Sequence, residues 1–178
     1  GYRSRFDKKA DHTEPGYYSV FLKDYGIKAE LTATERVGFH RYTFPESKES
    51  RIIFDVGHRQ GESSGVTEAI IRLSGKKELV GSIETYPEYL KFCDPEKRVK
   101  MYFVIRLNKE AESFGAFSEA EVFKSQKDSK GTGNGMYLNF STRKDEVVEM
   151  QVGLSYTSIE NAKNNLLVND AFHYINSV

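Results

Sequence analysis

The sequence predicts an all-β protein, an antiparallel β-sandwich with one short helix near the C-terminus. Apolar side chains recur at every second position in several segments, which is the period of a strand with one buried face. These segments are short, lie close together and are separated by residues typical of turns. Apolar residues at helical spacing occur in only one place, so the two-layer packing of antiparallel sheets is favoured over any helical class.

Three segments alternate most clearly between apolar and polar side chains. In the first, the face expected to be buried consists of Ile27, Ala29, Leu31 and Ala33. Its polar face, expected to point toward water, consists of Lys28, Glu30, Thr32 and Thr34. The other two segments place apolar side chains on one face at Val99, Met101, Phe103, Ile105 and Leu107, and at Val148, Met150, Val152, Leu154 and Tyr156.

Seven further strands are predicted at residues 17–22, 37–44, 51–56, 66–73, 78–85, 116–124 and 136–140. The sequences KDYG (23–26) and SGKK (74–77) are typical of hairpin turns. The polar stretch 126–135 predicts a mobile loop that ends in the glycine-rich sequence GTGNG. A strand is expected after these glycines, whereas a phosphate-binding loop would lead into a helix, so we interpret them as a turn.

One short helix is predicted near the C-terminus, in the sequence SIENAKNNLL. Ser158 is the expected N-cap, because its hydroxyl can accept a hydrogen bond from a free backbone N–H of the first turn. Ile159, Ala162 and Leu166 follow at helical spacing, over about two turns.

Size and charge limit the possible functions. The 178 residues fit one domain, spanning 1–178, and a chain of this length can bury roughly 70% of its unfolded surface. With 26 basic and 26 acidic side chains, the formal net charge is zero, which gives no general attraction to nucleic acid or anionic lipid. No apolar run approaches the length of a membrane span. The first residues lack the apolar region of a secretory signal, so we expect the chain to be a piece of a longer protein.

His40, Arg41 and Tyr42 are the candidate binding residues, because they place an imidazole, a guanidinium and a phenol in one strand. Alternation puts His40 and Tyr42 on one face and Arg41 on the other, so the three cannot form a single clamp. In one interpretation His40 and Tyr42 face a sugar or a domain interface. In the other, Arg41 forms a structural ion pair with a carboxylate such as Glu30 or Glu35.

No catalytic or metal-binding residue is predicted. His12, His58 and His173 are isolated in the sequence, without further ligands at the spacing of a metal site. Cys93 is the only cysteine, so no internal disulfide can form, and it lies in no nucleophile motif. Acidic residues are plentiful, but the separation of carboxylates that a glycosidase needs cannot be seen in a linear sequence.

Three blocks of the sequence resemble the amino-terminal domain of the family 92 glycoside hydrolases, exo-acting α-mannosidases common in Bacteroides-type gut bacteria. The longest is YYSVFLKDYGIKAELTATERVGFHRYTFP (17–45), preceded by GYRSRF (1–6). The third is GMYLNF (135–140) together with VGLSYTSIENAKNNL (152–166), which is similar to the family pattern VGISxVSIExAKxNL.

The resemblance implies a β-supersandwich of the galactose-mutarotase type, which in the complete enzyme packs against an (α/α)6 barrel. It implies a periplasmic or secreted hydrolase that removes terminal α-linked mannose from glycans with the help of calcium. The family's catalytic residues and calcium ligands belong to the barrel, so the resemblance assigns none to this chain. It implies a non-catalytic domain that supports the barrel and lines part of its cleft.

A stand-alone carbohydrate-binding module is the alternative interpretation. The family domain usually begins earlier than this chain, with a segment that bears glycine and tryptophan, and this chain contains no Trp. We expect the absent lead-in to leave an unpaired sheet edge, which favours dimerisation. The resemblance assigns no role to residues 81–115.

Overall fold

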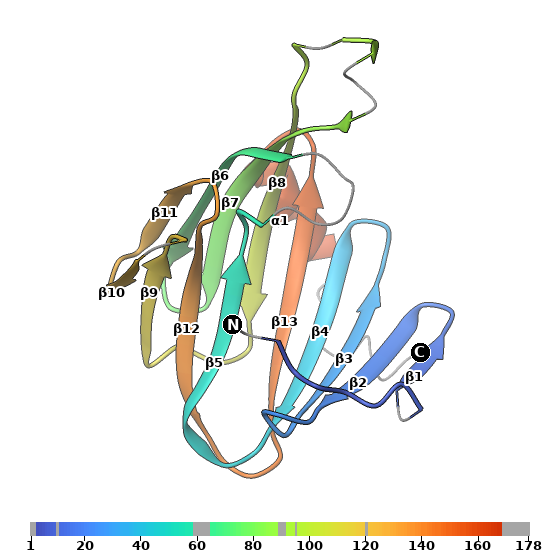
Figure 1. Ribbon diagram of the computed structural model, residues 1–178, viewed down its shortest axis with the longest axis vertical. Helices are drawn as coiled ribbons and strands as arrows, with labels where there is room; N and C mark the ends of the chain where they lie inside the picture. Colours follow the sequence, from blue (N-terminus) through green and yellow to red (C-terminus); the bar gives the residue numbers. More distant parts are fainter. Residues whose placement is uncertain are drawn as a thin grey trace.

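The computed structural model describes residues 3–9, 11–58, 65–88, 92–94, 96–119 and 121–168. It confirms an antiparallel β-sandwich with one helix (Figure 1). The nine strands of the larger sheet, in spatial order, are β1 (His12–Glu14), β2 (Tyr17–Leu22), β3 (Ile27–Ala33), β4 (Val37–Phe44), β13 (Glu146–Ser155), β8 (Val99–Leu107), β7 (Glu78–Tyr86), β6 (Gly65–Ser74) and β11 (Asp128–Gly131). The four strands of the smaller sheet are β10 (Val122–Lys124), β9 (Ser113–Phe117), β12 (Gly135–Thr142) and β5 (Ser47–Asp55).

The main core lies between the two sheets. The predicted alternation of β8 is confirmed, since Phe103, Ile105 and Leu107 all point into this core. The small sheet contributes Met136, Leu138 and Phe140 from β12, together with residues of β5 and β9. Of the four strands β1 to β4, only β4 contributes a buried member of this cluster, Phe44, although Ala29 of β3 is also buried. The small sheet therefore covers only part of the large one.

The helix α1 (Ile159–Val168) packs on the outer face of the large sheet. Ala162 and Leu166 are buried there against side chains of β4, β7 and β8. Gly153 allows this approach, because a Cβ at that position would lie 2.4 Å from the Ala162 carbonyl oxygen. Ser158 is the N-cap, as predicted, and its Oγ accepts a hydrogen bond from the Asn161 N–H at 3.0 Å. Ile159, in the first turn, remains 37% exposed.

The predicted strand 116–124 was wrong in one respect, since the chain folds back on itself there. The N–H of Ser118 donates to the Glu121 carbonyl at 2.9 Å, which closes a turn between β9 and β10. The apolar residues on either side of this turn hid the break from pattern reading. The strand β1 was also missed, because its three residues are polar and exposed.

The stretch 126–135 contains an edge strand, β11, which pairs with β6, so the predicted loop was wrong for residues 128–131. Its polar composition gave no strand signal. The glycine-rich turn that follows carries the chain from the large sheet to the small one and is tied to the end of β5, because Gly57 N–H donates to the Asn134 carbonyl at 2.9 Å. The Asn134 side chain is buried and bonds the Ser129 hydroxyl at 3.0 Å.

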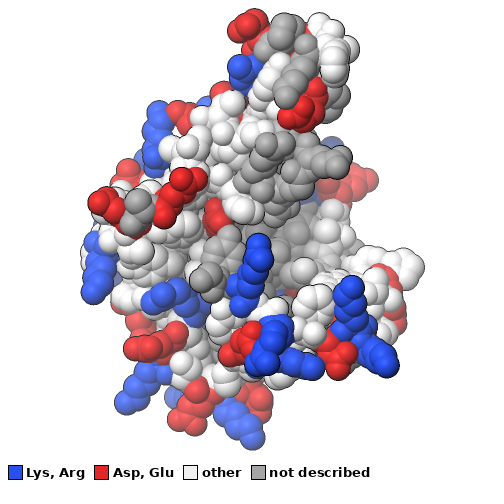
Figure 2. Space-filling view, in the orientation of Figure 1, with Lys and Arg blue, Asp and Glu red and all other residues white. Residues whose placement is uncertain are grey.

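The surface is mixed in charge. Basic and acidic side chains are interspersed over the face shown in Figure 2, in keeping with a formal net charge of zero. Within the described part of the chain, no helix has the length and apolarity that crossing a membrane requires.

Gly81 offers a direct test of how tightly the large sheet is packed. A Cβ at Gly81 would lie 2.0 Å from the Ile70 carbonyl oxygen and 2.5 Å from Cζ of Phe103. We expect Gly81→Ala to lower the free energy of unfolding by about 1–3 kcal/mol through overpacking, measured by urea denaturation. The control is Gly65→Ala, since a Cβ there meets nothing within 4 Å. Equal midpoints for the two variants would contradict the packing described.

Candidate functional site

His40 and Tyr42 lie side by side on the inner face of β4. Nδ1 of His40 and the Tyr42 hydroxyl are hydrogen-bonded at 2.9 Å, and the ring centroids are 6.0 Å apart. Burial lowers the pKa of His40 and raises the pKa of Tyr42 to about 12. At neutral pH the pair is therefore uncharged, with a protonated phenol beside a neutral imidazole.

Arg41 points to the outer face, so the predicted separation of these residues is confirmed. Its Nε donates to Oε1 of Glu149 at 3.1 Å, and both side chains are largely buried. The expected type of contact, an ion pair, is present and is made with Glu149; Glu30 lies opposite Arg41 on β3, where the charge of Arg41 helps to lower the pKa of Glu30. Glu149 lies directly opposite Arg41 on β13, and a pairing across 108 residues leaves no local signal in the sequence.

Glu30 and its neighbours show that the polar face of β3 is not exposed as predicted. The Glu30 carboxylate accepts hydrogen bonds from the Tyr17 hydroxyl at 2.7 Å and pairs with Lys28 Nζ at 3.2 Å. Burial raises the pKa of Glu30, but the hydrogen bonds from Tyr17 and Lys28 and the charges of Lys28 and Arg41 lower it on balance. Thr32 is also buried, and its hydroxyl donates to the Gly16 carbonyl at 2.5 Å. These partners allow a carboxylate and a hydroxyl to be buried on this face.

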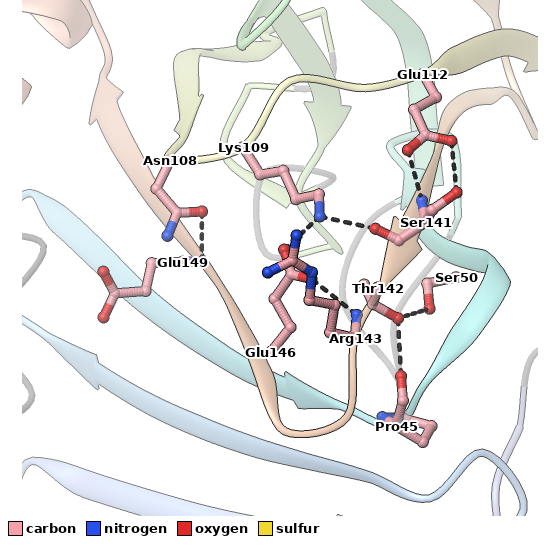
Figure 3. A network of polar contacts seen from close by, with 10 residues as sticks. All are labelled: Pro45, Ser50, Asn108, Lys109, Glu112, Ser141, Thr142, Arg143, Glu146 and Glu149. Carbon is pink, nitrogen blue, oxygen red and sulfur yellow. Dashed lines mark hydrogen bonds and ion pairs between the residues drawn. The ribbon is translucent and has the colours of Figure 1, made fainter.

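Two carboxylates, those of Glu112 and Glu146, hold the chain where it crosses between the sheets (Figure 3). Lys109 Nζ forms an ion pair with Glu146 and donates to the Ser141 carbonyl at 2.7 Å. The second carboxylate oxygen of Glu146 accepts the Arg143 N–H at 2.8 Å. Glu112 accepts the Ser141 N–H at 3.0 Å and the Ser141 hydroxyl at 2.7 Å.

Each of these carboxylates is held in its ionised form. Hydrogen bonds from the Ser141 hydroxyl and N–H lower the pKa of Glu112, and the hydrogen bond from Lys109 lowers the pKa of Glu146. A glycosidase general acid needs a raised pKa, so that it still carries a proton near neutral pH. Glu112 and Glu146 are therefore suited to holding loops together and not to donating protons.

The same end of the sandwich is tied at a third crossing, from β4 to β5. The Thr142 hydroxyl donates to the Pro45 carbonyl at 2.8 Å and contacts the Ser50 hydroxyl at 2.7 Å (Figure 3). Asn108 Oδ1 accepts the Glu149 N–H at 3.0 Å. The crossings β4–β5, β8–β9 and β12–β13 thus meet in one cluster, which we call the crossover clamp: Pro45, Ser50, Asn108, Lys109, Glu112, Ser141, Thr142, Arg143, Glu146 and Glu149.

Pattern reading missed a hollow at the end of β5, with a volume of about 540 Å³. Asp55, His58 and Glu119 line it, together with Thr132 and Gly133 of the β11–β12 turn. Among the described residues, no group of three or more His, Cys, Asp or Glu side chains is placed to hold a metal ion. The hollow brings together residues of β5, β6 and β9 and of the turn after β11, so nothing in the linear spacing indicates it.

The other residues considered for metal binding or nucleophilic chemistry, His12, Cys93 and His173, do not come together in one site among the described residues. His12 contacts Glu14 at 2.7 Å on the exposed strand β1, so it has an acidic neighbour that spacing did not indicate. Cys93 is exposed, and its thiol is free. His173 lies outside the described residues.

The buried pair on β4 predicts a pH dependence of stability. Since the pKa of His40 is lower in the folded than in the unfolded protein, the unfolded state binds the extra proton first, and stability is lost as pH falls below about 6.5. We expect His40→Leu to flatten the change in urea midpoint between about pH 7.5 and pH 5.5. His12→Leu, on an exposed strand, is the matched control. A slope unchanged by His40→Leu would contradict this expectation.

The crossover clamp predicts a second pH dependence of stability, which involves the Glu146 carboxylate and lies at lower pH. The pKa of Glu146 is lowered, so its contribution is present above its unfolded pKa of about 4.5 and is lost as pH falls through the folded value. We expect Glu146→Gln to cost about 1 kcal/mol at pH 7 and progressively less below pH 4.5, by urea denaturation. Exposed Glu35→Gln should change little at any pH. A cost for Glu146→Gln that stays constant into acid would refute an ionic role.

Comparison with known proteins relates the whole chain to one family. Residues 1–155 match the model of the glycosyl hydrolase family 92 N-terminal domain. No curated protein matches the chain.

Solved structures of the same family superpose on this chain. The family GH92 α-mannosidase BT3965 from Bacteroides thetaiotaomicron superposes with a TM-score of 0.86 at 25% identity, over 99% of this chain and 23% of that one. The family GH92 inverting mannosidase BT2199, from Bacteroides thetaiotaomicron VPI-5482, superposes with a TM-score of 0.79 at 20% identity, over 98% of this chain and 22% of that one. The gh92 family glycosyl hydrolase ccman5 superposes with a TM-score of 0.79 at 21% identity, over 98% of this chain and 24% of that one. The likeness to these last two structures shows the fold alone. The chain spans about a quarter of the length of these proteins, and by its match over residues 1–155 it belongs to glycosyl hydrolase family 92, as an N-terminal domain.

Proposed function

We propose that this chain is the non-catalytic N-terminal sandwich of an exo-acting α-mannosidase, where it supports a helical catalytic barrel and lines part of the cleft. One observation carries the proposal: 99% of the chain superposes on 23% of an α-mannosidase of the same family, with a TM-score of 0.86. A domain that corresponds to one part of such an enzyme is expected to act together with the enzyme's other domains.

The chemistry of the described side chains supports this division of work. Glu112 and Glu146 of the crossover clamp, and Glu30, have lowered pKa values and hold partners within the fold. A glycosidase needs a carboxylic acid that keeps its proton and a second carboxylate at a set distance. In our proposal both belong to the barrel, and the mannose-containing glycan binds between the two domains.

Calcium enters the proposal only through the complete enzyme. Calcium prefers six to eight oxygen ligands, with carboxylates prominent among them. The described residues contain no cluster of three or more acidic or other metal-ligating side chains that could hold a metal. They do not fit a calcium site, and we place its ligands in the remainder of the polypeptide. We also propose that the complete enzyme works in the periplasm or outside the cell.

Activity measurements on two forms of the protein test the proposal. The full-length polypeptide should hydrolyse α-mannobiose in the presence of calcium and lose this activity with a chelator, whereas residues 1–178 alone should release no mannose. NMR titration of the isolated chain with mannosides should show little or no binding. Clear binding without hydrolysis would favour a carbohydrate-binding module. Hydrolysis by the isolated chain, abolished by Glu119→Gln in the hollow, would overturn the proposal.

A further inference from the structure

We propose that the end of the sandwich that carries the hollow, opposite the crossover clamp, docks onto the rest of the polypeptide, with Phe92 as its main apolar anchor. The occupant is the catalytic part of the same longer chain, which would receive the Phe92 ring in an apolar recess. Because it requires a longer polypeptide, this proposal rests on the proposed function. It adds which face of the domain meets the catalytic part.

The direction of the strands distinguishes the two ends of the sandwich. The crossover clamp lies where β5 begins and where β12 ends. The hollow lies at the opposite ends of the same two strands, since Asp55 pairs with Gly135. In the large sheet, Gly65 of the hollow pairs with Tyr86, the last residue of β7. The hairpin between β7 and β8 therefore projects from the hollow end, as the green segment at the top of Figure 1 shows.

The most exposed large apolar side chains gather at this end. Phe92, in the β7–β8 hairpin, is 93% exposed, Tyr156, directly after β13, is 72% exposed, and Val122 is 67% exposed. Val122 pairs with Phe117, which lines the hollow. In the described part of the chain, every other large hydrophobic side chain is 56% exposed or less. Single exposed apolar residues are common, but three at one end indicate a surface that meets a partner.

The hairpin that carries Phe92 is braced at its base. The Arg98 guanidinium stacks over the Tyr86 ring, 4.3 Å from the ring centroid, where the chain leaves β7 and returns to β8. The N–H of Lys97 donates to the Asp94 carbonyl at 3.1 Å, which closes a turn on the returning arm. Phe92 nevertheless has almost no contact with its own domain, as its exposure shows. A ring presented on a braced support loses less conformational freedom when a partner covers it.

Polar groups at the two ends are used differently. At the clamp end, the carboxylates of Glu112 and Glu146 are bonded to groups of the domain itself. At the hollow end, none of the described residues forms a hydrogen bond or ion pair with the side chain of His58 or Glu119. The polar groups of the hollow end are thus available to a partner, whereas those of the clamp end are already occupied.

The rest of the polypeptide is favoured as the occupant over a second copy of this chain. This chain covers only 23% of an α-mannosidase of its family, so most of such a protein lies outside these residues and can supply the docking face. Two hollows on the described surface, the one at Asp55 and another at Glu78 and Arg106, are lined mainly by polar, charged or glycine residues. Neither offers the Phe92 ring of a second copy an apolar recess.

Cys93, next to Phe92, has a free and exposed thiol and reports whether the anchor is covered. We expect N-ethylmaleimide to modify Cys93 at least tenfold more slowly in the full-length polypeptide than in the isolated chain, measured by peptide mass spectrometry. Lys144→Cys, exposed near the clamp, is the control and should react alike in both forms. Equal rates at Cys93, or equal slowing of both cysteines, would overturn the proposal. So would protection of Cys93 in the isolated chain that rises with its concentration, since this would indicate a second copy.

A matched pair of variants adds a second measurement. Phe92→Ser should restore rapid modification of Cys93 in the full-length protein and leave the urea midpoint of the isolated chain unchanged. Val147→Ser, which truncates a 39% exposed side chain near the clamp, should leave Cys93 protected. Activity separates the two proposals: an active α-mannosidase in which Cys93 reacts as fast as in the isolated chain refutes only the docking surface. Protected Cys93 in a full-length protein without α-mannosidase activity refutes only the proposed function.

Discussion

The fold depends on keeping the apolar faces of two unequal sheets in register while the chain passes repeatedly between them. Successive residues of a strand point to opposite faces, so a slip of one residue would turn Phe103, Ile105 and Leu107 out of the core. The crossover clamp fixes this register at one end, where Glu146, Glu112 and Thr142 each bind a different crossing segment. Its polar and charged groups hold the crossings β4–β5, β8–β9 and β12–β13 together, where no helix or disulfide does so.

This use of charge gives a consistent account of function. Carboxylates that hold loops must stay ionised, whereas a glycosidase acid must keep its proton, and the two demands require opposite surroundings. Glu112 and Glu146 lie in surroundings that meet the first demand. A domain of family 92 with this chemistry contributes shape and stability to an enzyme, and the reacting groups are provided elsewhere in our proposal.

Strands whose alternation is strong could be predicted from the sequence, and those that depend on distant partners could not. Residues 37–44 and 99–107 match β4 and β8 because their apolar positions repeat over eight or nine residues. The strand β11 is polar and forms only because β6 offers an edge. Of the candidate site, the opposite orientation of His40 and Arg41 followed from the period of two. Glu149 as the partner of Arg41, and the hollow at Asp55, needed the tertiary fold.

The position of β13 has a consequence for how the protein is made. This strand is the last of the sandwich in the sequence, yet it lies between β4 and β8 at the centre of the large sheet. During synthesis, the early strands β1 to β4 and the later group β6 to β8 must wait, as two separate ribbons, until residues 146–155 leave the ribosome. Such non-local pairing folds slowly and keeps strand edges open to wrong partners. A nascent chain stalled before this strand would be a natural client for chaperones.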